Sequence, residues 1–341
     1  MPYHFRNLVF EGGGVKGVAY AGSLQVLHEK GILEQIKRVG GTSVGSITAL
    51  LVGLNYSIDE INNILSGLDF RRFLDDSWGI VRDVGRLLTQ FGWYKGDFFH
   101  TWVENLIAAK TGKTNATFAQ VYNLSENHEF KDIYFIGTNL STGFSEVFSY
   151  EHTPQMGIAD AVRISISVPL IFAARRSDRG DVYIDGGALN NYPVKLFDRE
   201  RYVEQFLTYP DYYREYNQKL SDEGKIINPY AYNQETLGFR LDSAGEIACF
   251  HDHAEPPRHN INDFFSYTWR LIDTILECQE NQHLHSDDWH RTIYIDTLGV
   301  KAMDFGIDNN TKQALINSGR ENTIKYLKWF DSTESTPSNR P

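Results

Sequence analysis

The apolar positions change period repeatedly within the first 66 residues, and these changes predict strand–helix units. Residues 5–10 (FRNLVF) form a short, largely apolar stretch that is typical of a buried strand. From Gly17 the apolar residues follow a helical spacing, and Gly31 is expected to end that helix. Residues 36–39 predict a second strand, and the helix after it has an apolar face formed by Ile47, Leu50, Leu51 and Leu54. This alternation indicates an α/β protein.

The alternation continues further along the chain. Ser57 and Glu60 fit a capping box, which predicts that a helix begins there. No linker or repeat divides the chain, so we expect one domain over residues 1–330 and a polar, disordered tail at 331–341. Further strands are predicted at 133–136, 146–150, 182–184, 237–241 and 292–295, and further helices at 261–283 and 310–329.

Two glycine-rich turns join the first strands to their helices. The first turn has the sequence GGGVKG at residues 12–17, and the second has GTSVG at residues 41–45. Backbone N–H groups at the start of a helix favour negative charge, and glycine lets an anion approach them closely. The second turn fits G-x-S-x-G, in which a strand-to-helix elbow exposes a serine hydroxyl, here that of Ser43 between Gly41 and Gly45. Together the turns predict a nucleophile and an oxyanion hole, and therefore acyl transfer.

A nucleotide-binding role for the first turn is the main alternative. Gly12, Gly14 and Gly17 also fit the dinucleotide fingerprint G-x-G-x-x-G. That fingerprint requires an acidic residue at the end of the second strand, where this chain has Gly-Gly-Thr-Ser instead. Lys16 does not complete a phosphate-binding P-loop, because the spacing is wrong and no Ser or Thr follows it.

A third glycine-containing turn carries an acidic group. The strand predicted at 182–184 leads into Asp185, Gly186 and Gly187, which leave a carboxylate at a strand end with open space beside it. On its own, Asp-Gly is most often an ordinary turn.

The three motifs, taken in this order, resemble the patatin-like phospholipase family. The resemblance rests on GGGVKG at 12–17, GTSVG at 41–45 and DGG at 185–187, and the recognisable portion runs from about residue 5 to 195. Residues 161–169 (AVRISISVP) and 191–193 (NYP) are softer matches, and 305–329 is similar to the family's final helix. The resemblance implies a three-layer α/β/α sandwich with a mostly parallel central sheet and helical, aromatic-rich insertions.

The resemblance also implies a Ser–Asp dyad without metal or cofactor. Ser43 would be the nucleophile and Asp185 the general base, and the N–H groups around Gly12, Gly13 and Gly14 would hold the oxyanion, with Lys16 adding positive charge nearby. The implied substrate is a phospholipid or lysophospholipid, cleaved at a fatty acyl ester during peripheral contact with a membrane. An activator or partner protein is compatible with this role. An Ala at Gly13 or Gly14 is expected to lower kcat without affecting folding.

Two other functions remain open at this point. A catalytically silent binding or effector protein could use the same scaffold. An α/β-hydrolase also runs Ser, then Asp, then His, and six histidines follow Asp185, although the serine elbow comes unusually early for that fold. A metal site at the H-x-H pair is less favoured, because no acidic or Cys partner stands at a recognised spacing. The six histidines are His251, His253, His259, His283, His285 and His290.

Two regions interrupt the strand–helix pattern. Residues 68–130 predict an aromatic-rich insertion that packs on the core as a cap or forms a lid or acyl-chain channel over Ser43. Residues 198–236 predict an irregular surface excursion, rich in tyrosine, for contact with a partner or a membrane interface. The aromatic residues of the first region are Phe70, Phe73, Trp78, Phe91, Trp93, Tyr94, Phe98, Phe99 and Trp102.

Composition restricts the partners and the cellular compartment that we expect for the protein. The 341 residues carry a formal net charge of −11, which argues against nucleic-acid binding. Two cysteines, Cys249 and Cys278, form no disulfide framework, and this favours a reducing compartment. The N-terminal residues do not resemble a secretory signal, and no apolar run is long enough to span a membrane. We therefore expect a cytoplasmic protein that binds membranes peripherally, or an effector secreted without a cleaved signal.

Overall fold

An eight-stranded sheet forms the centre of the protein. The computed structural model describes residues 3–74, 89–225, 228–244 and 288–332, together with isolated positions at 87 and between 258 and 274. Seven of the sheet's strands lie side by side in the order β12 (Thr292–Asp296), β11 (Thr236–Asp242), β1 (Asn7–Phe10), β2 (Arg38–Gly41), β4 (Asp132–Asn139), β8 (Val182–Asp185) and β7 (Arg175–Arg176). The eighth strand, β5 (Phe144–Phe148), also pairs with β4.

The direction of the strands defines two edges of this sheet. Strands β12, β11, β1, β2 and β4 are parallel, so all five end at one edge and begin at the other. Strand β8 is antiparallel to β4, with Asp185 opposite Gly137. We call the edge where the parallel strands end the carboxyl edge, and the opposite one the amino edge. Loops at the carboxyl edge are where open α/β sheets bind ligands.

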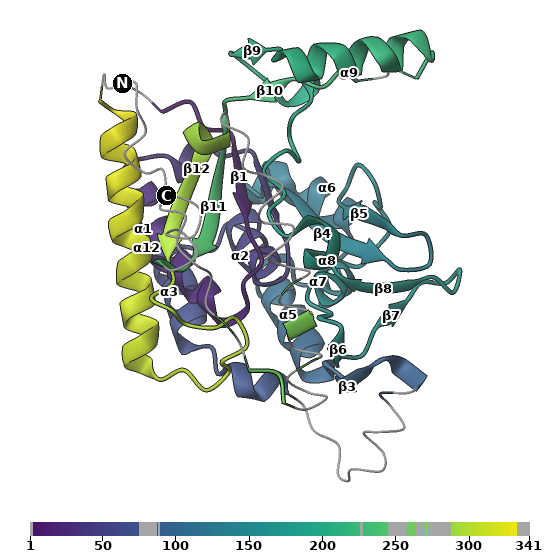
Figure 1. The fold of residues 1–341 in the computed structure, drawn as a ribbon, viewed down its shortest axis with the longest axis vertical. Coiled ribbons are helices and arrows are strands. Elements are labelled where there is room, and N and C mark those ends of the chain that lie inside the picture. Colours follow the sequence, from purple (N-terminus) through teal and green to yellow (C-terminus); the bar gives the residue numbers. More distant parts are fainter. Residues whose placement is uncertain are drawn as a thin grey trace.

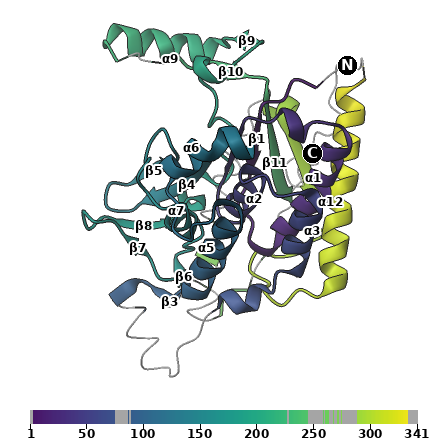
Figure 2. The same ribbon diagram turned by 180° about the vertical axis from the view of Figure 1, so that it is seen from behind.

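Helices cover one face of the sheet. Figures 1 and 2 show α12 (Asn309–Phe330) lying along α1 (Tyr20–Glu29) beside β12, with α3 (Ile58–Gly67) close to α1. Helix α2 (Val44–Gly53) packs on β1, β2 and β4. On the same side as the main core lie α7 (Ile158–Ser165) and its neighbour α5 (Asp97–Thr111). The remaining described α-helices are α6 (Phe118–His128), the single-turn α8 (Gly187–Asn190) and α9 (Asp211–Asp222).

Successive side chains of β1 point to opposite faces of the sheet and pack into two different core clusters. Leu8 and Phe10 belong to the large helix-covered core. Val9 points the other way, into a smaller cluster with Tyr134, Phe197 and Tyr202. Period-two alternation is what a sheet covered on both faces requires. Within the described residues, the segment from Tyr192 through the 3₁₀ turn Glu200–Tyr202 covers this second face.

Most elements predicted from the sequence are present. The mixed α/β fold with a mostly parallel sheet is confirmed, and each predicted strand overlaps an observed one. The capping box is formed, with the Ser57 hydroxyl accepting the Glu60 N–H and the Glu60 carboxylate accepting the Ser57 N–H. The chain leaves α1 at Gly31, whose φ of 66° favours glycine. The helix predicted at 261–283 and most of the tail predicted at 331–341 lie outside the described residues.

The aromatic-rich region packs inward where it is described. Phe73 and Phe99 are buried, with ring centroids 5.0 Å apart, and Trp102 lies against both rings. Their packing extends the main core, which is the first of the two predicted arrangements. A short strand of this region, β3 (Gly92–Tyr94), pairs with β6 (Leu170–Phe172). Trp78 lies outside the described residues.

The tyrosine-rich excursion is more regular than predicted. It contains α9 and a two-stranded ribbon of β9 (Leu207–Thr208) and β10 (Tyr232–Asn233), and α9 stands away from the body of the protein in both views (Figures 1 and 2). Periodicity did not reveal α9, because its few apolar side chains lie among charged and polar residues, although they follow a helical spacing: Tyr212, Tyr213, Tyr216 and Leu220. Its buried residue Tyr213 stacks on Tyr230 and donates a hydrogen bond to Asp198.

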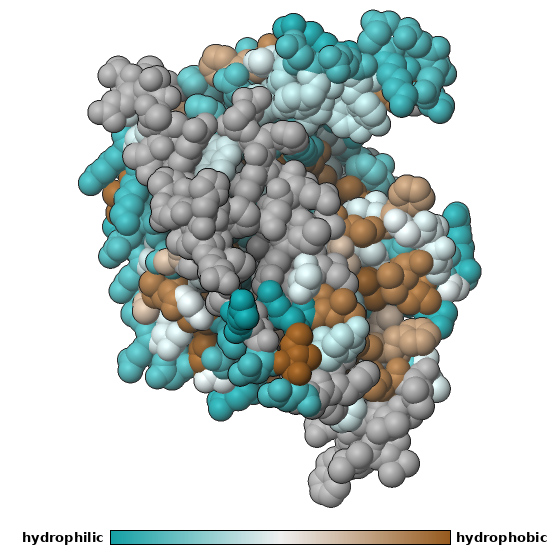
Figure 3. Space-filling view, in the orientation of Figure 1, coloured by the Kyte–Doolittle hydropathy of each residue, from teal (hydrophilic) through white to brown (hydrophobic). Residues whose placement is uncertain are grey.

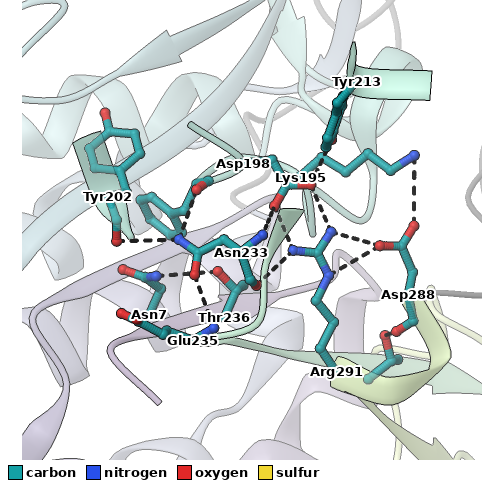
Figure 4. A network of polar contacts seen from close by, with 12 residues as sticks. Asn7, Lys195, Asp198, Tyr202, Tyr213, Asn233, Glu235, Thr236, Asp288 and Arg291 are labelled. Carbon is teal, nitrogen blue, oxygen red and sulfur yellow. Dashed lines mark hydrogen bonds and ion pairs between the residues drawn. The ribbon is translucent and has the colours of Figure 1, made fainter. Parts of the chain in front are cut away.

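A buried polar network fixes the base of the excursion at the amino edge (Figure 4). The Arg291 guanidinium lies between Asp198, at 2.5 and 2.8 Å, and Asp288, at 2.7 Å. Asn233 donates to two backbone carbonyls of the segment that covers the second face. Glu235 accepts the N–H groups of residues 204–206. Burial alone would lower the pKa of Arg291, but the two carboxylates outweigh it and raise that pKa well above its usual value.

Candidate active site

Ser43 occupies a strained turn at the carboxyl edge. It connects β2 to α2 with φ 52° and ψ −125°, a conformation that L-residues seldom adopt. The side chain is partly exposed, while the residues around it are buried. The flanking glycines are required by space: a methyl group at Gly41 would overlap the Gly45 carbonyl, and one at Gly45 would overlap the Phe10 carbonyl. The G-x-S-x-G sequence therefore forms the predicted elbow.

The sheet brings Asp185 to the same edge as Ser43. Strand β4 pairs with β2 along its first half and with β8 along its second half, so the end of β8 lies close to the end of β2. Asp185 is 3 % exposed, and its Oδ1 accepts the Gly187 N–H at 2.7 Å. Gly186 packs against the Ile136 carbonyl, where a side chain would not fit.

The Asp185 carboxyl is poised to exchange a proton near neutral pH. Burial raises its pKa to about 7, while the Gly187 N–H and then the Ser43 side chain act in the opposite direction. No hydrogen bond of standard geometry reaches Oδ2 from any described residue. A buried oxygen without a strong donor is an available proton acceptor. The Ser43 side chain nevertheless favours the charged carboxylate and lowers its pKa, so the two groups predicted to act together interact.

The first glycine turn lies against Ser43. A methyl group at Gly12 would come within 3.1 Å of the Ser43 Cβ. The Gly12 N–H donates to the Asn191 carbonyl at 3.1 Å, so it is engaged within the protein. In the part of the chain that is described, no acceptor is recorded for the N–H groups of Gly13 and Gly14, and both residues are partly exposed. Gly13 and Gly14 are therefore the available donors of this turn.

Segments from the last third of the chain hold the glycine turn in place. The Val15 N–H donates to the Ala302 carbonyl at 2.8 Å, and Gly14 at φ 55° packs directly on that carbonyl. The Lys16 ammonium donates to the Leu241 carbonyl at 3.2 Å, and the Leu241 N–H donates to the buried Glu11 carboxylate. Lys16 thus lies beside the turn and also anchors it. Gly17 packs against Val44 at the start of α2.

The end of α7 and the residues that follow it connect the two candidate catalytic residues, and sequence reasoning did not assign them a role. The Ser43 N–H donates to Ser165 Oγ at 3.1 Å, and the Asp185 N–H donates to the Ser167 carbonyl at 2.8 Å. The buried Arg163 guanidinium donates to Ser167 Oγ at 2.6 Å and to the Lys95 and Ala173 carbonyls. The signal that could have pointed to them was the segment 161–169, noted only as a soft family match.

Comparison with known proteins agrees with this arrangement. The model of the patatin-like phospholipase family matches residues 8–198, which include both glycine turns and Asp185. The chain belongs to the patatin-like phospholipase family. It is 34 % identical over 325 residues to uncharacterized protein R571 of Acanthamoeba polyphaga mimivirus, covering 95 % of this chain and 92 % of R571.

This patatin-like chain is also similar to a viral protein in sequence and to a solved bacterial structure in fold. "Probable lipid hydrolase 463L" of Invertebrate iridescent virus 6 is 27 % identical over 200 residues, which are 57 % of this chain and 64 % of that protein. The crystal structure of VipD from Legionella pneumophila superposes with a TM-score of 0.59 at 17 % identity, covering 95 % of this chain and 67 % of VipD. The likeness to VipD concerns the fold alone.

One of the six late histidines, His290, belongs to the described residues. His290 precedes β12 at the amino edge, where its carbonyl accepts the Tyr326 hydroxyl, so it lies at the opposite edge from Ser43. The other five predicted candidates lie outside the described residues. Within the described part of the chain, no group of three or more His, Cys, Asp or Glu side chains is arranged to hold a metal ion. None of the described helices combines the length and the apolar character needed to span a bilayer.

Proposed function

We propose that this patatin-like protein is a lipid acyl hydrolase that cleaves fatty acyl esters of phospholipids or lysophospholipids with a Ser43–Asp185 dyad. One observation carries the proposal: a serine on a strained elbow is in polar contact with a buried carboxylate whose pKa is about 7. A carboxylate of ordinary pKa is a weak base toward serine, and a pKa near the working pH improves proton transfer.

The proposed reaction has two halves. Asp185 accepts the Ser43 proton as Oγ attacks the ester carbonyl carbon, and the N–H groups of Gly13 and Gly14 stabilise the oxyanion. Collapse of the tetrahedral intermediate releases the lysolipid or, from a lysophospholipid, the deacylated glycerophosphodiester, whose hydroxyl takes the proton from Asp185. Water, deprotonated by Asp185, then attacks the acyl ester on Ser43, and the departing Ser43 oxygen regains that proton as the fatty acid leaves. Ser165 and Ser167 hold the backbones of the two residues and act as positioning residues.

The substrate class rests on family membership and on the name of a relative. The family is described as phospholipases, and 463L is named a lipid hydrolase. Phospholipid and lysophospholipid substrates reside in membranes and micelles, so the proposal includes peripheral contact with a lipid surface. The dyad itself uses no metal or cofactor.

Hydrolysis of lysophosphatidylcholine and of p-nitrophenyl fatty esters by purified variants tests this function. Ser43→Ala and Asp185→Asn should each lose at least about 10³-fold in kcat, the scale on which nucleophile or base removal acts in other hydrolases. His290→Gln, at the opposite edge, is the matched control and should retain activity. A folded Ser43→Ala variant with wild-type turnover would contradict the proposal, and so would a late histidine whose replacement by Gln abolishes turnover.

A further inference from the structure

A concave site lies on the second face of the sheet, the one that carries the small cluster around Tyr134 and Tyr202. A cavity of about 350 Å³ opens between this face, the segment that follows α8, and the end of α9. Figure 3 shows α9 overhanging the body of the protein on this side. The volume is within the range of small-molecule sites, ~300–1,000 Å³. The residues that line the cavity are Tyr134, Val147, His152, Leu196, Arg199, Arg201, Tyr202, Leu220, Lys225 and Asn228.

Positive charge predominates in this cavity although the protein as a whole is acidic. Arg199, Arg201 and Lys225 contribute cationic groups to the lining. Glu151 offsets part of this charge, since its carboxylate accepts hydrogen bonds from Arg201 and from the hydroxyls of Tyr134 and Tyr202. Lys225 also forms an ion pair with Glu223, but both side chains are largely exposed, and such pairs are weak.

The cavity holds more hydrogen-bond donors than acceptors. Arg199 uses Nη1 to reach the Asn228 carbonyl, and Arg201 uses Nη2 to reach Glu151 and Tyr202. Two nitrogens of each guanidinium donate to no described residue. They are Nε and Nη2 of Arg199, and Nε and Nη1 of Arg201. Two guanidinium groups with spare N–H donors match the oxygens of a phosphate group.

Aromatic stacking fixes both guanidinium groups before any ligand binds. The Arg199 guanidinium carbon lies 3.3 Å from the Tyr230 ring centroid, and that of Arg201 lies 4.6 Å from the Tyr202 centroid. Cation–π contact of this kind restricts a long side chain at little loss of charge. Preorganised donors bind more tightly because less rotamer entropy is lost on binding.

We propose that this cavity binds a small, soluble phosphate monoester, with the phosphate held by Arg199 and Arg201. The apolar side chains Val147, Leu196 and Leu220 line the same cavity and would contact the organic part. A soluble ligand is favoured over a lipid headgroup by position. The cavity lies toward the amino edge, whereas a membrane that delivers substrate to Ser43 would contact the carboxyl edge.

Isothermal titration calorimetry on the full chain at low salt tests the proposal with three probes. Inorganic phosphate and ribose 5-phosphate should bind with dissociation constants below about 1 mM, and uncharged ribose should not. Arg199→Gln and Arg201→Gln should each weaken ribose 5-phosphate binding by at least about 10-fold, because charge-assisted hydrogen bonds are lost. Lys225→Gln removes a largely exposed group that folding does not require, and it should weaken binding several-fold.

Matched variants separate this site from the proposed active site. Arg214→Gln on α9 removes an exposed arginine that pairs with Asp211 and does not line the cavity, so it should bind the probe like wild type. Ser43→Ala should also bind normally, and the cavity variants should retain ester hydrolysis. The proposal is overturned if no phosphate probe binds, if ribose binds equally well, or if all arginine variants bind alike. Binding seen only with vesicles containing phosphatidylinositol 4-phosphate would overturn the assignment of a soluble ligand.

Discussion

Asp198 at the amino edge and Asp185 at the carboxyl edge are both buried carboxylates, but their surroundings differ. Asp198 accepts both terminal nitrogens of Arg291, the Tyr213 hydroxyl and the Asn233 N–H. Asp185 accepts the Gly187 N–H and has the weaker polar contact with Ser43. The Asp198 carboxylate is neutralised by the buried Arg291 cation. Burial is the largest influence on the Asp185 carboxyl, and it raises the pKa of that group.

The difference shows how one sheet can support both stability and chemistry. A buried charge with a full set of partners holds the excursion in place, and removing one partner leaves the others uncompensated. A buried carboxylate with few partners destabilises the fold at neutral pH, and this same feature makes it a better base. The strained Ser43 lies at the same edge, as do the N–H groups of Gly13 and Gly14, which have no acceptor among the described residues.

The same substitution should therefore have opposite effects on stability at the two edges. Asp198→Asn leaves the Arg291 charge only partly compensated and should lower the free energy of unfolding by about 3–5 kcal/mol. Asp185→Asn removes a group whose folded-state pKa of about 7 exceeds its ordinary value of 3.8. Wild-type stability falls as pH rises between these two values, because the folded state retains its proton longer, and the Asn variant escapes this loss.

Urea unfolding of Asp198→Asn and Asp185→Asn at pH 5 and pH 8 measures both changes in stability. The stability gained by Asp185→Asn should be larger at pH 8, where it approaches about 4 kcal/mol, the limit set by three pKa units. The loss in Asp198→Asn should be present at both pH values. Equal and same-signed effects of the two substitutions would show that the edges do not differ in the way described.

The two partly exposed glycines of the first turn should respond differently to an added methyl group. Gly13→Ala should lower kcat by on the order of 10²-fold, because the methyl group meets the Leu241 side chain and shifts the N–H donors. The end of a flexible side chain can move, so folding should be nearly unchanged. The structure alters the sequence-based expectation for Gly14, whose φ of 55° and contact with the Ala302 carbonyl make Gly14→Ala destabilising. Steady-state kinetics with thermal unfolding separates the two; full turnover in Gly13→Ala would make the turn a packing element only.

Replacing Ser165 should lower kcat less than replacing Gly13. Ser165→Ala removes the acceptor of the Ser43 N–H and should lower kcat about 10-fold, equivalent to one hydrogen bond of ~1.4 kcal/mol, with little change in KM. Ser165→Thr retains the hydroxyl and should recover much of the rate. The midpoint of the pH–rate profile should not move, because Ser165 carries no proton in the reaction. A change confined to KM would argue against a positioning role.

Local patterns predicted the parts of the protein that depend on short-range rules. The capping box at Ser57 and the elbow at Ser43 each follow from a few adjacent residues whose backbone geometry is restricted. The strands were found by their apolar runs, although their ends differ by up to three residues. Asp185 could be singled out because glycines follow a strand end, and family resemblance linked it to Ser43.

Contacts between distant residues could not be read from the sequence. Ser43 and Ser165 are 122 residues apart, and the Ala302 carbonyl that holds the glycine turn lies beyond the portion resembling the family. Helix α9 escaped detection because its tyrosines lie among charged and polar residues, and because its packing depends on tyrosine stacking and a buried hydrogen bond to distant residues. The raised pKa of Asp185 depends on burial, which no local pattern specifies.

The most direct test of the dyad is the rate at which a fluorophosphonate labels Ser43 between pH 5 and pH 9. In the wild type the rate should rise with pH through a midpoint near 7, as Asp185 loses its proton and becomes able to accept that of Ser43. Peptide mass spectrometry should place the label on Ser43. Asp185→Asn should label at least about 10²-fold more slowly and without that midpoint. Labelling of folded Asp185→Asn at the wild-type rate, with the same pH dependence, would contradict the account.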